Sequence, residues 1–154
     1  RDEVRAPVYL ALYSDGEITV EEIVDSPKAP SIDLWVGMHD SAHATALGKC
    51  ILAALPDAQR RDYLARHPLH SLTRRTVTNA RRLEDEIGHA GPIVHDDEEY
   101  AIGVHCRAAP VITPQLVGAV AVAHRCAPSL SESAVDSALT RSAQRIQRSL
   151  TMSM

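Results

Sequence analysis

The chain has 154 residues, of which 45% are hydrophobic and 23% charged, and its formal net charge is −4. These values exclude a disordered chain and a strongly basic nucleic-acid-binding domain, and no apolar run is long enough to cross a membrane. Three cysteines, Cys50, Cys106 and Cys126, lack CxxC spacing. We therefore expect free thiols and a cytoplasmic protein rather than a disulfide framework.

The chain begins with the pattern of a β-hairpin. Residues 4–13 are apolar and β-prone, and Asp15-Gly16 is a strong signal for a tight turn. Residues 17–24 alternate well enough to form the second strand. A loop at 26–31 and a third strand at 32–37 are expected to follow.

Helical patterns occupy the middle of the chain. Residues 44–55 predict a buried helix because leucine and isoleucine recur every four residues. Pro56-Asp57 ends this helix, and Asp57 is expected to cap the next one, at 57–66. Asn79 is the expected cap of a third helix, at 81–90, which Gly91 would close.

Three strands and a helix are predicted for the remainder. The strands are expected at 93–95, 100–107 and 117–124, and Ser129 with Glu132 forms a capping-box pattern before the final helix. An apolar stripe marks one side of that helix: Val135, Leu139, Ile146 and Leu150. The order of strands, helices, strands and helix predicts one α+β domain over 1–154, with a mostly antiparallel sheet.

Several side chains could bind a metal ion. His39 and His43 have the four-residue spacing of a helical ligand pair, although HDSAH lacks the glutamate of a zincin motif. A second group could supply a site for Fe(II) or zinc: His95, Asp96, Glu98, Glu99, His105, Cys106 and His124. However, adjacent residues on a strand point to opposite faces, so His105 and Cys106 should not reach one metal centre. A metal-binding sensor and a metal-dependent enzyme are therefore alternatives.

Catalysis without a metal has less support in the sequence. Cys106 could be a nucleophile with a histidine as its base, but a lone cysteine on a strand of small residues is more often buried and inert. The chain has no GxSxG elbow and no glycine-rich phosphate loop. The residues alone thus favour a small-molecule pocket over an active site.

Four stretches, in order, resemble IclR-family transcriptional regulators. HATALGKCILAALP at 43–56 is similar to the family's H-x-S/T-A-x-G-K-A-x-L-A segment, and TRRTVTNARRLEDEI at 73–87 to its T-x-x-T…L-x-x-E-L stretch. DDEEYAIGVHCRAAPV at 96–111 resembles its D-x-E-E…A-A-P-V segment, and GAVAVA at 118–123 its last strand. The resemblance covers nearly the whole chain.

The resemblance implies the C-terminal effector-binding domain of such a regulator, without its N-terminal winged helix-turn-helix. The implied fold is GAF-like or profilin-like: a curved, mainly antiparallel sheet flanked by helices. The implied partners are a small-molecule effector, commonly an organic acid, and further copies in a homodimer or dimer of dimers. DNA would be contacted only through the missing N-terminal domain. No cofactor, metal, membrane or enzyme activity is implied.

The resemblance also implies a ligand pocket. Its residues would come from the start of the first helix, the acidic segment and the last two long strands: Thr45, Ala46, Leu47, Asp96, Val104, Cys106, Ala121 and Ala123. Helix N-terminal N–H groups suit a carboxylate. Glu98 and Glu99 are expected to cap backbone N–H groups or to face solvent.

This chain departs from the family pattern inside the implied pocket. Leu47 replaces a small residue and narrows the pocket, while Ala121 and Ala123 replace two serines and remove their hydroxyl groups. These departures favour an aromatic or otherwise partly apolar acid as the ligand over a small polar keto acid.

Overall fold

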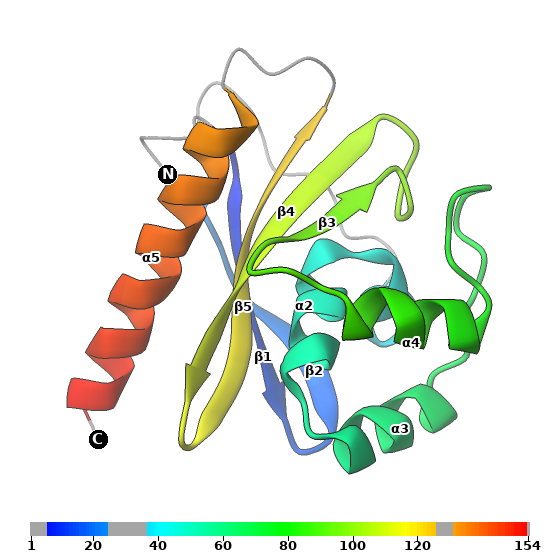
Figure 1. Cartoon of the computed structure of the whole chain (residues 1–154), viewed down its shortest axis with the longest axis horizontal. Coiled ribbons are helices and arrows are strands. Elements are labelled where there is room, and N and C mark those ends of the chain that lie inside the picture. The colour runs from blue at the N-terminus through cyan, green and yellow to red at the C-terminus, as the bar shows by residue number, and fades with distance from the viewer. Residues whose placement is uncertain (1–5, 25–36, 126–130, 154) are drawn as a thin grey trace.

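A five-stranded antiparallel sheet forms the centre of the computed structural model, with α5 on one face and α2, α3 and α4 on the other (Figure 1). The structure describes residues 6–24, 37–125 and 131–153. Its elements, in chain order, are β1 (Val8–Ser14), β2 (Glu17–Val24), α1 (Met38–Ser41), the 3₁₀ helix η1 (Ala42–Ala44), α2 (Ala46–Ala54), α3 (Asp57–Arg66), α4 (Ala80–Gly88), β3 (Val94–Asp97), β4 (Val104–Thr113), β5 (Leu116–Arg125) and α5 (Glu132–Met152). The predicted α+β class with an antiparallel sheet is confirmed.

The sheet has the strand order β2-β1-β5-β4-β3. The predicted hairpin joins β1 to β2, and Asp15 and Gly16 have φ values of 52° and 80° in its turn. Residues with positive φ match the right-handed twist of paired strands, so this dipeptide favours the hairpin. The expected third strand at 32–37 lies outside the described residues.

The sheet separates two hydrophobic cores. On β5, Ala119, Ala121 and Ala123 face the core that includes α2, while Val120 and Val122 face the core beneath α5. This alternation follows from the two-residue period of a strand. The predicted apolar stripe of α5 packs in the second core, so the side carrying α2 is left for a ligand pocket.

The predicted limits of β4 are wrong. The strand runs from Val104 to Thr113, whereas we expected 100–107. Its start is delayed by a turn in which Glu98 has a φ of 61° and Gly103 a φ of 81°. Its end was missed because alanine and proline, which fill 108–110, are depleted in strands.

Two predicted helix caps are also wrong, and a third lies outside the described residues. Ser131 caps α5 by accepting from the Ala134 N–H, whereas the expected cap, Ser129, is not among the described residues. Helix α4 ends at Gly88 instead of reaching Gly91, although Asn79 caps its start as predicted. Asp57 is the first residue of α3 and accepts a bond from Arg60 rather than capping the backbone.

Candidate ligand-binding site

One cavity brings all eight predicted pocket residues together, between the start of α2 and the sheet. Thr45, Ala46 and Leu47 come from the helix side, Asp96 from β3, and the other four from β4 and β5. Three further residues, Tyr9, Met38 and Tyr100, line the same cavity. Sequence reasoning missed them: Tyr100 stands in the quoted acidic segment, but no motif marks Tyr9 or Met38.

The start of α2 presents polar groups to the cavity. The Thr45 hydroxyl caps the helix by accepting from the Gly48 N–H at 3.0 Å. The first N–H groups of a helix, here those of Ala46 and Leu47, have no partner within the helix. The positive end of the helix dipole adds to them, so this wall favours a negatively charged group.

Gly48 allows the helix to sit where it does. A Cβ atom at this position would collide with the backbone of Ala42 in η1. The glycine therefore lets η1 and α2 pack backbone to backbone, which fixes the turn that carries Thr45.

Asp96 supplies a buried carboxyl group to the same cavity. Its side chain is fully buried, and Oδ1 accepts from the Glu99 N–H at 2.8 Å. Oδ2 has no hydrogen-bond partner among the described residues. Burial, with a smaller contribution from the charge of Glu99, raises the pKa of Asp96 to about 7. This group can accept a hydrogen bond from a ligand hydroxyl, or donate one when protonated.

The opposite wall is built from small and apolar side chains. Cys106 lies beside Asp96 in the β3–β4 ladder, and Ala121 and Ala123 follow on β5. Burial, reinforced by the carboxyl of Asp96, raises the pKa of the Cys106 thiol well above its usual value. A thiol held in its neutral form is a poor nucleophile, so Cys106 is a wall residue rather than a catalytic one.

A buried ion pair braces the turn after Asp96. The Lys49 Nζ on α2 lies 2.7 Å from Glu99 Oε2, and both side chains are largely buried. Of the two roles expected for Glu99, the solvent-facing one is therefore wrong. For Glu98 the capping role is confirmed, because its Oε2 accepts from the Gly103 N–H at 3.2 Å.

The cavity is almost filled by its own walls. Its free volume is about 30 Å³, room for about two water molecules, whereas a benzene-sized ligand occupies a cavity on the order of 150 Å³. An aromatic acid can therefore bind only if part of the wall moves.

The candidate metal ligands are dispersed. Within residues 6–24, 37–125 and 131–153, no three His, Cys, Asp or Glu side chains form a group that could hold a metal ion. His43 is buried, and its Nε2 lies 2.8 Å from the His70 carbonyl oxygen. The His39 side chain lies outside the described part.

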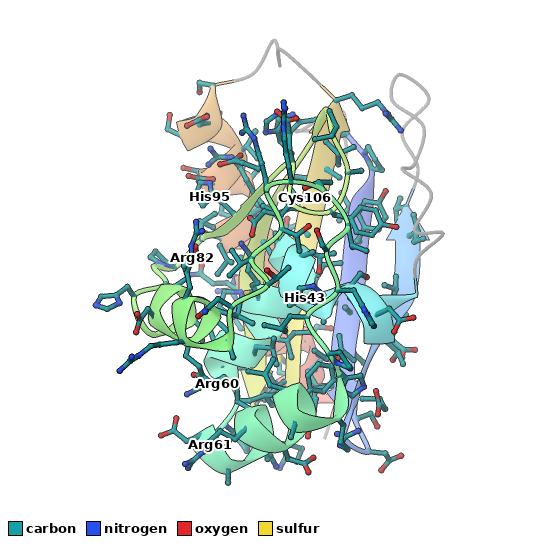
Figure 2. The ribbon with its side chains drawn as sticks, turned by 90° about the vertical axis from the view of Figure 1, so that its right-hand side faces the viewer. His43, Arg60, Arg61, Arg82, His95 and Cys106 are labelled. Carbon is teal, nitrogen blue, oxygen red and sulfur yellow. The ribbon has the colours of Figure 1, made fainter. Side chains whose placement is uncertain are left out.

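The second group of candidates is divided between the faces of β4. His105 stacks on His124 and lies 3.1 Å from an oxygen of Asp97, while Cys106 faces the cavity. This is the opposite-face arrangement that alternation on a strand predicts. His43 on η1 and His95 on β3, from the two candidate groups, also lie well apart (Figure 2).

The Arg60-Arg61 pair of α3 is not simply a solvated helix face. Figure 2 shows Arg60, Arg61 and Arg82 beside α3 and α4, away from Cys106. The Arg60 side chain is only 15% exposed and binds Glu84 of α4 at 3.1 Å. Its guanidinium also donates to the Leu55 carbonyl at the end of α2. Arg60 therefore joins three helices and is not part of a nucleic-acid surface.

These features together define an α+β domain with a candidate ligand pocket, and three comparisons place it among known proteins. The family model for the C-terminal part of bacterial IclR transcriptional regulators matches residues 1–148. The Pca operon regulatory protein of Acinetobacter baylyi is 39% identical over 116 residues, which are 70% of this chain and 41% of that protein.

Solved structures share the fold. IclR of Thermotoga maritima superposes with a TM-score of 0.82 at 26% identity, covering 97% of this chain and 63% of that one. An IclR homologue of Microbacterium hydrocarbonoxydans, solved in complex with 4-hydroxybenzoate, has a TM-score of 0.82 at 21% identity and covers 98% and 63%.

The chain belongs to the IclR family and corresponds to its C-terminal effector-binding domain. The GAF-like fold implied by the resemblance is confirmed. The matched relatives are transcriptional regulators and repressors, so the family is one of regulators and not of enzymes. In the described part of the chain, no helix has the length and apolar character needed to span a bilayer.

Proposed function

We propose that this domain binds a hydroxylated aromatic acid and thereby controls DNA binding by a full-length regulator. One observation carries the proposal: a single cavity joins the N-terminus of α2 to the unpartnered oxygen of Asp96, with apolar walls between them. A carboxylate suits the helix end, a ring suits the alanines and Cys106, and a hydroxyl group suits Asp96. The 4-hydroxybenzoate bound by the Microbacterium homologue has all three parts.

The eight predicted residues are the proposed contacts. Thr45, Ala46 and Leu47 would face the carboxylate, and Asp96 the hydroxyl group. The ring would lie against four further side chains: Val104, Cys106, Ala121 and Ala123. The missing serine hydroxyls on β5 make this wall apolar, which supports an aromatic ligand over a small keto acid.

The route from ligand to DNA is part of the proposal. The chain spans about two fifths of its Acinetobacter relative, and DNA would be contacted through a winged helix-turn-helix outside residues 1–154. The domain would pair as a homodimer or dimer of dimers in the cytoplasm. The effector would shift the population of these arrangements only to the extent that it binds them with different affinity.

A thermal-shift screen tests the proposed ligand class. The panel is 4-hydroxybenzoate, benzoate, cyclohexanecarboxylate and pyruvate, each with zinc and with a chelator. A hydroxybenzoate at 100 times its Kd should stabilise the domain by about 2.7 kcal/mol, and hence raise Tm by about 5–10 °C, regardless of metal. Stabilisation by pyruvate alone, or by zinc alone, would contradict the proposal.

A further inference from the structure

The cavity is nearly filled, so one of its walls must move to admit a ligand. Most walls are held by hydrogen bonds. The strand residues belong to the sheet ladders, and the start of α2 is capped by Thr45. The turn that carries Tyr100 is held by two hydrogen bonds. The Thr73 hydroxyl donates to the Glu98 carbonyl oxygen, and the Thr76 hydroxyl donates to the Glu99 carbonyl oxygen, each at 2.7 Å.

Met38 differs from these walls in its side chain, while its carbonyl oxygen accepts from the Ala42 N–H. It begins α1, a single helical turn, and its side chain is 8% exposed. Among the described residues, its Sδ accepts one weak hydrogen bond, from the Thr45 hydroxyl at 3.7 Å. Methionine is unbranched and has three rotatable bonds, so it can change rotamer at small cost.

A second hollow lies on the other side of Met38. This surface groove has a volume of about 990 Å³ and is lined by β2, α1 and the end of α3. Of the described residues that line the groove or the cavity, Met38 is the one that lines both. Among the described residues, Met38 therefore lies between the groove and the nearly filled cavity.

We propose that Met38 is the movable partition through which the effector reaches the cavity, and that its side-chain space becomes part of the ligand's space. This inference rests on the proposed function, since it names the access route and size limit of the same cavity. When Met38 rotates into the groove, the two spaces join and the Thr45 hydroxyl loses its sulfur partner. An oxygen of the incoming acid takes the place of that sulfur.

Two consequences follow for binding. Access requires a rotamer change, so association should be slower than for a preformed open pocket. The length of the side chain at position 38 should also limit the ligand, because a shorter residue leaves the joined space permanently open.

The test measures binding rates by surface plasmon resonance on the wild-type chain and three variants. Met38→Ala removes the partition. Met38→Leu keeps its volume with a stiffer, branched side chain, and such volume-conserving exchanges are well tolerated in packed sites. Met152→Ala is the matched control, because Met152 lies on α5 across the sheet and is 87% exposed. The probes are 4-hydroxybenzoate and the two-ring acid 6-hydroxy-2-naphthoate.

We expect Met38→Ala to bind 4-hydroxybenzoate at least fivefold faster than the wild type and the naphthoate at least tenfold more tightly. Met38→Leu should associate several-fold more slowly, and Met152→Ala should match the wild type. Equal association rates in all four chains would overturn the access route, and an unchanged naphthoate affinity would overturn the size limit. If no chain binds any hydroxybenzoate or naphthoate, the proposed function fails as well.

Discussion

The Lys49 ammonium and the Glu99 carboxylate, 50 positions apart in sequence, lie 2.7 Å from each other with side chains only 7% and 12% exposed. The pair ties the middle of α2 to the turn that follows Asp96. Burial raises the pKa of Glu99 even though Lys49 opposes that shift. The contact thus holds a wall of the cavity in place at the expense of desolvating two charges.

Removing one partner of this pair should be strongly destabilising. Lys49→Met leaves Glu99 buried without a counter-charge, and we expect a loss of about 3–5 kcal/mol in the free energy of unfolding. Urea denaturation monitored by circular dichroism measures it. The double variant Lys49→Met/Glu99→Leu should recover most of the loss, because two apolar side chains can replace a buried pair. Additive losses in the double variant would show that the two groups act independently.

The carboxyl of Asp96 should make stability depend on pH. The folded state holds its proton up to a pKa of about 7, whereas the unfolded chain releases it near 3.8. Between these values the native state binds more protons, so the free energy of unfolding falls as pH rises. Asp96→Asn removes this loss and should gain up to about 4 kcal/mol over the wild type at pH 8.

The comparison is made by denaturant unfolding at pH 5 and pH 8. At pH 5, about one pH unit above the pKa of the unfolded carboxyl, the wild type has lost only about 1.6 kcal/mol, so the difference between the two chains should be less than half of that at pH 8. A constant difference at both pH values would mean that Asp96 is ionised throughout, and would remove its role as a hydrogen-bond donor.

Gly48 and Gly88 should respond oppositely to the same substitution. Gly48→Ala forces η1 away from α2, because the new Cβ collides with the Ala42 backbone. We expect a loss of about 1–3 kcal/mol, as for other overpacked sites. Gly88→Ala, at the end of α4, meets no atom within 4 Å and should be neutral or gain up to about 1 kcal/mol. Thermal unfolding of both variants checks the pair, and equal effects would contradict the close packing of η1 on α2.

Ala121 and Ala109 offer a matched test of which face binds the ligand. Ala121 lines the cavity, whereas Ala109 packs in the core beneath α5, and both are 2% exposed. Ala121→Val adds two methyl groups to a nearly full cavity and should weaken binding of 4-hydroxybenzoate at least tenfold by calorimetry. Ala109→Val should change stability alone. Equal affinities in the two variants would place the ligand elsewhere.

Local sequence patterns predicted many of the strands, helices and caps, but they could not predict contacts between distant segments. The hairpin, β5 and the Asn79 cap depend on a few neighbouring residues, so their signals are complete in the sequence. Ser129 and Ser131 are both good caps, and propensity alone could not choose between them.

Within the site, motif resemblance located eight residues that share one cavity. It could not reveal the pairing of Lys49 with Glu99 or the position of Met38, because both depend on how distant segments pack. For the same reason it could not show that the cavity is nearly filled by its own walls.

The alternation along β5 has a consequence for how such domains diversify. Substitutions at residues 121 and 123 reshape the cavity, while those at 120 and 122 adjust the packing of α5. The choice of ligand and the stability of the fold therefore depend on alternate positions of one strand. A gene encoding this domain can explore new effectors at the odd-numbered positions while the scaffold is maintained by their even-numbered neighbours.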